Sequence, residues 1–310
     1  MRITDHRSSG KRWPSFMSPR YVVLGNATEE VCVRADSSPP AARGGGGRIA
    51  VAVAYGVICH AAFAAGVGAM MVAMYFGMSR SLGALSAPWS WIANAALLAQ
   101  FPVVHSLLLT SRGRAVVNRL GPRGAGPTLA PTTFVTVASL QVFVLFALWS
   151  PSGTVWWQAH GAVLGVLDVL YACAWVLLGK AMFDAGLSVQ IGTLGWLTLL
   201  RGQRLVYPKM PTTGLFRLTR QPIYVAFTLT VWTVPTWTPD QLAVAATFTA
   251  YCLIAPLFKE ARYRRIHGSE FDNYARRVPY WLPWPGRPRS PSGRHCEPAA
   301  GRERISRRQG

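Results

Sequence analysis

The chain has 310 residues, of which 51% are apolar and only 14% are charged, and its formal net charge is +20. This composition excludes an ordinary soluble domain. The basic excess would suggest nucleic acid in a soluble protein, but here the charges avoid the long apolar runs and gather between them. We therefore expect an all-α, polytopic membrane protein in contact with the lipid bilayer and with no nucleic-acid partner.

The N-terminal segment, residues 1–48, is rich in Arg, Ser, Pro and Gly and has no apolar periodicity. It cannot bury a core, so the sequence predicts a disordered basic tail. A true start at Met17 would also account for it. We expect no signal peptide, because the first apolar run begins near residue 49 and is too long for one. Residues 286–310 have a similar composition and are also predicted to be a disordered basic tail.

Residues 49–285, between these tails, are predicted to form one transmembrane domain. A helix needs about 20 apolar residues to cross about 30 Å of hydrocarbon. Six stretches meet or approach that length: 49–78, 89–109, 132–149, 161–178, 223–237 and 241–258. The last two form a C-terminal helical hairpin. Its first member rises only ~23 Å at ~1.5 Å per residue, so it must thin the bilayer or stop below one face.

Basic residues alternate with the predicted crossings. The N-terminal tail has eight Lys and Arg, the loop around Gly121 four, residues 180–221 six and the segment from Lys259 thirteen, whereas the other loops have one or none. By the positive-inside rule, both termini and residues 180–221 face the cytoplasm. We expect the membrane to be a bacterial cytoplasmic membrane. Seven tryptophans lie near the predicted outer interface as an aromatic belt: Trp89, Trp91, Trp149, Trp156, Trp157, Trp232 and Trp237.

One further apolar stretch, residues 187–200, is short and interrupted by glycine. If it crossed the membrane, the hairpin would reverse and its trailing basic residues would lie outside. The sequence therefore favours an interfacial or re-entrant helix.

The five cysteines are scattered, with no close pair and no spacing typical of metal ligands. Three of them lie in apolar runs, where a free thiol packs as a small hydrophobic group. We expect neither a disulfide framework nor a metal site.

Two clusters of charged and aromatic residues flank the hairpin. The first reads GLFRLTRQPIYVAF from Gly214, and the second runs from Lys259 through SEFDNYARRVPYWLP. If the hairpin crosses the membrane twice, both clusters emerge on one side and face each other. We expect a cytoplasmic pocket at the bilayer surface, bordered by Arg217, Arg220, Gln221, Tyr224, Glu260 and Tyr274.

The ordered string of these motifs resembles the C-terminal half of membrane methyltransferases related to isoprenylcysteine carboxyl methyltransferase. It is most similar to the branch with methanethiol S-methyltransferase and the NnrU-type proteins. The family pattern is Gly-x-Tyr-Arg-x-x-Arg-His-Pro-x-Tyr, a hairpin, Glu-Glu, Tyr-x-x-Tyr and Arg-Val-Pro. The counterparts here are Gly214, Phe216, Arg217, Arg220, Gln221, Pro222 and Tyr224, then Lys259 and Glu260, then Phe271 and Tyr274, then Arg277, Val278 and Pro279. The family-like core spans 211–284, with a weaker similarity upstream in QFPVVHSLLLTSR.

The resemblance implies methyl transfer from the cofactor S-adenosylmethionine to a small thiol or a lipophilic acceptor. Such an enzyme must hold the cofactor and the nucleophile in line and keep water out. The alternative is a diverged, non-catalytic membrane protein that retains the methyltransferase fold. A transporter has little support, because the two halves of the chain have no pair of corresponding broken helices, although Asp168 within a predicted span keeps this alternative open.

The resemblance also implies roles for individual residues. Glu260 and Arg220 are the expected catalytic residues. The expected cofactor-binding residues are Arg217, Gln221, Pro222, Tyr224, Glu260, Tyr274 and Arg277. Arg217 and Arg220 would share a face of a helical turn and suit a carboxylate, and Glu260 would face the cofactor's ammonium. The structural alternatives are snorkelling arginines, interfacial tyrosines and a carboxylate that only neutralises its basic neighbours.

Two residues are weaker candidates for substrate binding. His105 lies in the upstream similarity, although a buried histidine with satisfied hydrogen bonds is the better interpretation. Asp168 lies in the middle of the fourth predicted span. Placing a carboxylate within the membrane costs free energy, so such a residue is first interpreted as functional. It would otherwise be protonated and hydrogen-bonded between helices.

The sequence departs from the family pattern at three positions. The family His is Gln221, which cannot titrate. The first Glu of the acidic pair is Lys259, a charge reversal, and the Asn-His-Phe element after the fourth span is absent from KAMFDAG. A thiol with a pKa of ~8.5 is mostly protonated at neutral pH, so a thiolate acceptor would have to rely on the arginines.

Overall fold

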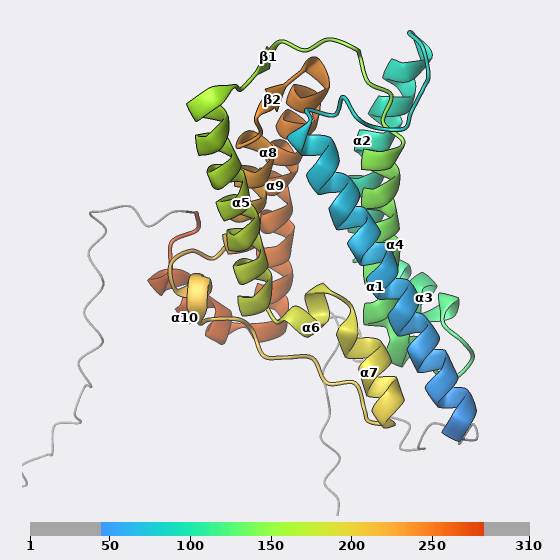
Figure 1. The fold of residues 1–310 in the computed structure, drawn as a ribbon. Helices are drawn as coiled ribbons and strands as arrows, with labels where there is room; N and C mark the ends of the chain where they lie inside the picture. The colour runs from blue at the N-terminus through green and yellow to red at the C-terminus, as the bar shows by residue number, and fades with distance from the viewer. Residues whose placement is uncertain (1–44, 282–310) are drawn as a thin grey trace, which may run out of the picture. The chain divides into compact units, whose positions relative to one another are not determined.

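The computed structural model describes residues 45–281, and both predicted tails lie almost entirely outside this range. Residues 45–48, which we assigned to the N-terminal tail, form the first turn of a helix. The elements are α1 (Gly45–Tyr75), α2 (Trp89–Leu108), α3 (Ser111–Leu120), α4 (Gly126–Ala147), β1 (Trp157–Gln158), α5 (Gly161–Asp184), α6 (Leu187–Gln190), α7 (Thr193–Arg201), the 3-10 turn η1 (Gly214–Arg217), α8 (Pro222–Trp232), β2 (Thr236–Trp237), α9 (Pro239–His267) and α10 (Ser269–Arg277), as Figure 1 shows.

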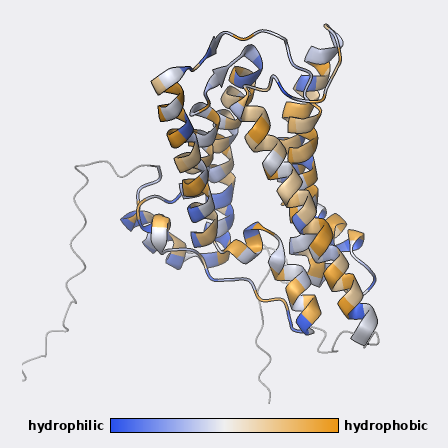
Figure 2. Ribbon diagram, viewed as in Figure 1, coloured by the Kyte–Doolittle hydropathy of each residue, from blue (hydrophilic) through white to orange (hydrophobic). Residues whose placement is uncertain are grey.

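Five helices of the described part, α1, α2, α4, α5 and α9, are long and apolar enough to cross a membrane. Their apolar residues run along most of their length (Figure 2), and large apolar side chains such as Val57, Val166 and Val176 are exposed, as contact with lipid requires. The predicted all-α polytopic membrane fold is confirmed.

The fifth predicted span, 223–237, is shorter in the structure than we expected. It is α8, a helix of 11 residues that starts at Pro222 and rises only about 16 Å. Proline is favoured in the first turn because it lacks the N–H that a helix start leaves unpaired. The described chain therefore has five long spans and one short apolar helix in place of six full spans.

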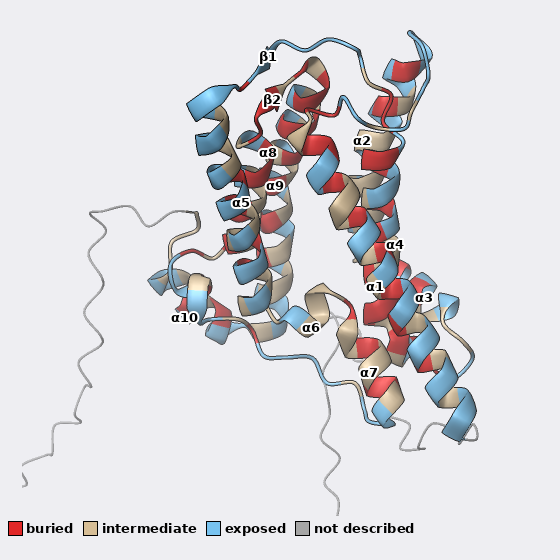
Figure 3. Ribbon diagram, viewed as in Figure 1, coloured by how far each residue is buried: buried red, intermediate tan, exposed pale blue. Residues whose placement is uncertain are grey.

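The buried core lies where the helices face one another. α1 packs along α4, α5 against α8, and α8 against α9. The largest cluster of buried side chains joins α1, α4, α8 and α9 through Met74, Phe146, Val231 and Phe248, and the Phe146 and Phe248 rings are stacked 6.4 Å apart. Figure 3 shows the buried residues on these facing sides and the exposed ones on the outer sides.

The loop after α4 and the tip of the hairpin lie together at one end of the helices. β1 and β2 form a two-stranded antiparallel pair, with Trp157 opposite Trp237. The Asp240 carboxylate accepts a hydrogen bond from the Ser152 N–H at 2.8 Å. The basic segments with α3, α7 and α10 lie at the opposite end (Figure 1). The basic segments and the loops that have few or no basic residues thus lie at opposite ends of the helices.

Residues 187–200 form two short helices, α6 and α7, with Gly192 between them at φ +76°. The Thr132 hydroxyl on α4 donates to the Gly192 carbonyl at 2.7 Å and accepts the Trp196 N–H at 2.9 Å. α7 packs against α1 and α4. Neither helix is long enough to cross a membrane, in agreement with the predicted interfacial or re-entrant segment.

Candidate active site

The first motif enters the site through the turn η1, whose start depends on Gly214. Gly214 has φ +58°, a conformation that side chains other than glycine rarely adopt, and a Cβ there would clash with the Asp184 carboxylate. Asp184, at the end of α5, accepts a hydrogen bond from the Leu215 N–H at 2.8 Å and pairs with Lys180. α5 therefore fixes the direction from which the motif reaches α8.

The second motif holds the first through α10 and the segment after it. The Tyr274 hydroxyl donates to the Phe216 carbonyl at 2.8 Å, and the Arg220 N–H donates to the Pro279 carbonyl at 3.0 Å. Burial raises the pKa of the Tyr274 phenol, so the hydroxyl stays protonated and remains a donor at physiological pH. The two clusters around the hairpin do meet, as the sequence predicts.

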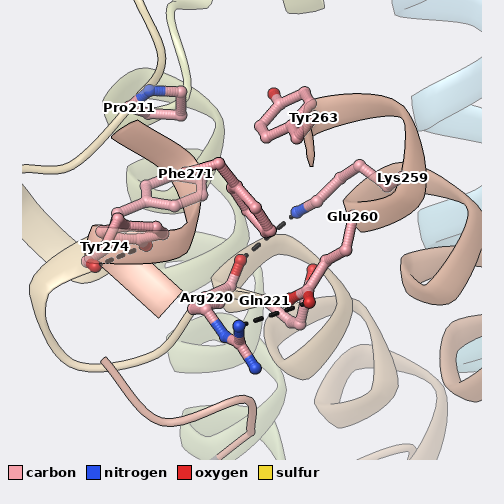
Figure 4. Close-up of a pocket in the computed structure, with 9 residues that line it drawn as sticks. Pro211, Arg220, Gln221, Lys259, Glu260, Tyr263, Phe271 and Tyr274 are labelled. Atoms are coloured by element: carbon pink, nitrogen blue, oxygen red, sulfur yellow. Dashed lines mark hydrogen bonds and ion pairs between the residues drawn. The ribbon is translucent and has the colours of Figure 1, made fainter. Parts of the chain in front are cut away.

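A narrow cavity of about 10 Å³ lies between the two motifs, room for about one water molecule. Figure 4 shows the Arg220 and Gln221 side chains directed at the Glu260 carboxylate. The Gln221 amide Nε2 donates to Glu260 Oε1 at 2.7 Å, and Arg220 Nη1 lies 3.3 Å from Glu260 Oε2. The lining residues are Pro211, Phe216, Arg220, Gln221, Lys259, Glu260, Tyr263, Phe271 and Tyr274.

Two polar atoms in this cavity are buried without a hydrogen-bond partner, Arg220 Nε and Gln221 Oε1. A buried polar atom without a partner costs about 1–3 kcal/mol. One is a donor and the other an acceptor, so a ligand with both a carboxylate and an ammonium group could satisfy both.

Four of the predicted site residues line the cavity together: Arg220, Gln221, Glu260 and Tyr274. Arg217 and Arg277 are exposed and do not line it. Arg217 lies on the turn η1, so it does not share a helical face with Arg220 as we expected. Pro222 is buried at the start of α8, and the Tyr224 ring lies beside the cavity, 5.4 Å from Lys259 Nζ.

The two weaker candidates lie outside the lining. The His105 ring is stacked on Phe101 at 5.1 Å, but its Nδ1 is buried without a hydrogen-bond partner, so the expected histidine with satisfied hydrogen bonds is wrong in that respect. Asp168 accepts a hydrogen bond from the Tyr75 hydroxyl at 2.8 Å, so Tyr75 is the partner that the sequence left unnamed.

Sequence reasoning assigned no role in the site to five residues that also line the cavity: Phe216, Lys259 and Phe271, which it named only as motif counterparts, and Tyr263 and Pro211, which it missed altogether. Tyr263 lies four residues after Lys259, on the same face of α9, and this spacing is the signal that could have identified it. Pro211 precedes the motif and approaches only through the fold. The residues that the structure describes include no group of His, Cys, Asp and Glu that could hold a metal ion.

Fold and site together define a polytopic helical membrane protein with a charged pocket at one end of a helical hairpin. Comparison with known proteins narrows this class. Methanethiol S-methyltransferase 1 of Bradyrhizobium diazoefficiens is 29% identical over 194 residues, which are 62% of this chain and 67% of that protein. Methanethiol S-methyltransferase of Mycobacterium tuberculosis is 28% identical over 199 residues, 63% of this chain and 79% of that protein.

Nurim of Rattus norvegicus is 27% identical over 168 residues, 51% of this chain and 62% of that protein. No protein-family model matches the chain, and no solved structure matches it. The similarities confirm the predicted resemblance to the methanethiol S-methyltransferase branch. They support the predicted class, a methyltransferase embedded in a membrane.

Proposed function

We propose that this protein is an S-adenosylmethionine-dependent methyltransferase that methylates a small thiol at the cytoplasmic face of a bacterial membrane. The observation that carries the proposal is the convergence of Arg220, Gln221 and Glu260 on one cavity. When bound, S-adenosylmethionine would supply a methyl group on a positively charged sulfur: the acceptor thiolate would form a bond to the methyl carbon as the bond from that carbon to the cofactor sulfur breaks, so that neutral S-adenosylhomocysteine leaves and the thiol proton goes to solvent.

The residues of the cavity fit the amino-acid end of this cofactor. The Glu260 carboxylate suits the ammonium, and the Arg220 guanidinium suits the carboxylate, since a planar guanidinium can donate two parallel hydrogen bonds. The unpartnered atoms Arg220 Nε and Gln221 Oε1 are a donor and an acceptor for these two groups. Their present lack of partners supports a ligand site over a purely structural ion pair.

The cavity must open to admit such a ligand. Its ≈ 10 Å³ is far below the roughly 300–1,000 Å³ of typical ligand pockets. Arg220 and Glu260, paired at 3.3 Å, both line this cavity. We infer that binding separates this pair, so that each partner exchanges the other for an opposite charge on the ligand.

The thiol acceptor is favoured by the cations beside Glu260. A free thiol has a pKa of ~8.5, and nearby cations favour its thiolate form. Arg220 and Lys259 line the cavity, and both would favour the anion in the absence of the family His. Methanethiol, the acceptor in the names of two relatives, is the first to test. A lipophilic acceptor from the bilayer is the next.

The test is methyl transfer by purified protein in nanodiscs, supplied with S-adenosylmethionine and methanethiol. Dimethyl sulfide in the gas phase, matched by S-adenosylhomocysteine in solution, is the expected result. The rival proposal is a non-catalytic protein with the same fold. The reason to consider it is that Gln221 and Lys259 stand where the family pattern has His and Glu. Failure to bind either S-adenosylmethionine or S-adenosylhomocysteine would favour that rival.

A further inference from the structure

The Lys259 ammonium lies among three aromatic rings at the edge of the candidate active site. Its Nζ is 5.9 Å from the ring centre of Phe216, 5.4 Å from that of Tyr224 and 5.7 Å from that of Tyr263. The three rings come from η1, α8 and α9, which are brought together only by the hairpin. We name Phe216, Tyr224 and Tyr263 the aromatic cage.

An ammonium is poorly satisfied in this position. Lys259 has three N–H donors, and the structure gives it one acceptor, the Arg220 carbonyl at 3.3 Å. The neighbouring Glu260 carboxylate is directed at Gln221 and Arg220 instead. Figure 4 shows the Lys259 ammonium directed at the Arg220 backbone and apart from the Glu260 carboxylate.

Aromatic faces bind cations electrostatically within about 6 Å of the ring centre, and cages of such rings recognise onium groups that have no N–H to donate. A sulfonium is a cation of this kind. It would gain the attraction of all three rings and would leave no donor unpaired. The cage therefore suits a sulfonium better than it suits the lysine that now lies in it.

We propose that the aromatic cage is the sulfonium subsite of the pocket, and that Lys259 occupies it in the ligand-free protein. The inference rests on the proposed function, since it assigns one part of the same cofactor to particular side chains. Phe216, Lys259 and Tyr263 all line the cavity where Arg220 and Glu260 converge. The flexible four-carbon stem of lysine allows the ammonium to leave when a sulfonium enters.

The consequence is a difference between two ligands. S-adenosylmethionine carries the sulfonium and must displace the Lys259 ammonium, whereas S-adenosylhomocysteine has a neutral sulfur and does not compete for the cage. Lys259→Met keeps an unbranched apolar side chain and removes the competing cation. It should strengthen binding of S-adenosylmethionine by about tenfold and leave binding of S-adenosylhomocysteine within about twofold.

The experiment measures both affinities by calorimetry on purified, full-length protein in detergent. Arg265→Met is the matched control, because Arg265 is an exposed cation on the same helix, and it should change neither affinity. Tyr263→Leu should weaken binding of S-adenosylmethionine several-fold, whereas Tyr263→Phe, which keeps the ring, should not. Unchanged binding of S-adenosylhomocysteine identifies the variants that are folded.

The two proposals fail differently. If Lys259→Met alters both affinities equally, or alters neither, the cage is not a sulfonium subsite, although the proposed function stands. Equal affinities of Tyr263→Leu and the unaltered protein for S-adenosylmethionine would also overturn the cage. Absence of binding of both ligands to the unaltered protein would overturn the proposed function and the cage with it.

Discussion

The Gln221 amide nitrogen lies 2.7 Å from Glu260 Oε1, and this hydrogen bond joins the start of α8 to the C-terminal half of α9. Gln221 is fully buried, and Glu260 is 8% exposed. Because Arg220 contacts the other carboxylate oxygen, both oxygens of Glu260 have donors. A buried carboxylate requires such partners. Substitutions of Glu260 and of Gln221 therefore test whether their hydrogen bond belongs to a ligand site or only stabilises the fold.

Glu260→Gln keeps the shape of the side chain and removes its charge. We expect a loss of affinity for S-adenosylmethionine of roughly tenfold to a hundredfold, because a hydrogen bond to a charged group contributes about 1.5–3 kcal/mol. Calorimetry on purified protein measures it without knowledge of the acceptor.

Glu270→Gln is the matched control for this change. The Glu270 side chain is 69% exposed and lies 4.0 Å from His267, outside the cavity lining. Removal of the Glu270 charge should leave the affinity for S-adenosylmethionine unchanged, since exposed ion pairs contribute little free energy. Equal effects of the two substitutions would mean that Glu260 only balances the charges around it.

Gln221→His tests the departure from the family pattern. An imidazole can donate to Glu260 as the amide does, so we expect cofactor affinity to be preserved and methyl transfer to be preserved or raised. Gln221→Leu leaves Glu260 Oε1 without that donor and should destabilise the protein by about 1–3 kcal/mol. Thermal unfolding and binding together separate the two effects. A histidine variant as impaired as the leucine variant would contradict this prediction.

The order of the motifs along the chain predicted some residues of the site, whereas the local geometry of a turn could not be predicted. Arg220, Gln221, Glu260 and Tyr274 were identified because their motifs occur in a fixed order around one hairpin. Arg217 was placed with them on the assumption of a helical turn. Pro222 delays the start of the helix, so Arg217 lies on a 3-10 turn instead. Local spacing does not show where such a turn directs its side chains.

Some helices could likewise be predicted from the sequence and others could not. Lipid demands long apolar runs, so hydropathy located the five long spans within a few residues at most ends. α4 begins at Gly126, six residues before the expected start, with Pro127 in its first turn. α3 has no long apolar run and was taken for part of a loop. The Thr110 hydroxyl, which accepts the Gly113 N–H at 3.1 Å as an N-cap, is the signal for it.

Gly214→Ala tests the support that α5 gives to the first motif. A Cβ at this positive φ costs about 1–3 kcal/mol, and it would also displace the Asp184 carboxylate from the Leu215 N–H. We expect a lower unfolding temperature and weaker cofactor binding. Gly179→Ala on α5 is the control, because a Cβ there meets nothing within 4 Å. Equal unfolding temperatures for the two variants would contradict this account.

Cysteine accessibility tests the orientation of the protein. In a cysteine-free background, a cysteine at Thr154, in the loop beside the hairpin tip, should react with a membrane-impermeant reagent added outside intact cells. A cysteine at Arg204, after α7, should react only after the cells are opened. Both positions are exposed in the structure. The reverse labelling pattern would place the basic segments and the candidate pocket outside, against the prediction.

The last prediction concerns Asp168, whose partner is now known. The Tyr75 hydroxyl donates to Asp168 Oδ1 at 2.8 Å, between α1 and α5. If this bond only joins the helices, Asp168→Asn keeps an acceptor and should cost at most about 1 kcal/mol, whereas Tyr75→Phe leaves the carboxyl without its donor and should cost about 1–3 kcal/mol.

Neither change should alter cofactor affinity, because neither residue lines the cavity. Thermal unfolding in detergent measures the first effect and calorimetry the second. If Asp168 instead binds the acceptor, Asp168→Asn would keep the unfolding temperature and the cofactor affinity and would abolish methyl transfer. That outcome would assign Asp168 to the substrate path, as expected of a carboxylate that is retained within a span despite its cost. It would reject the interpretation that the bond to Tyr75 only joins the two helices.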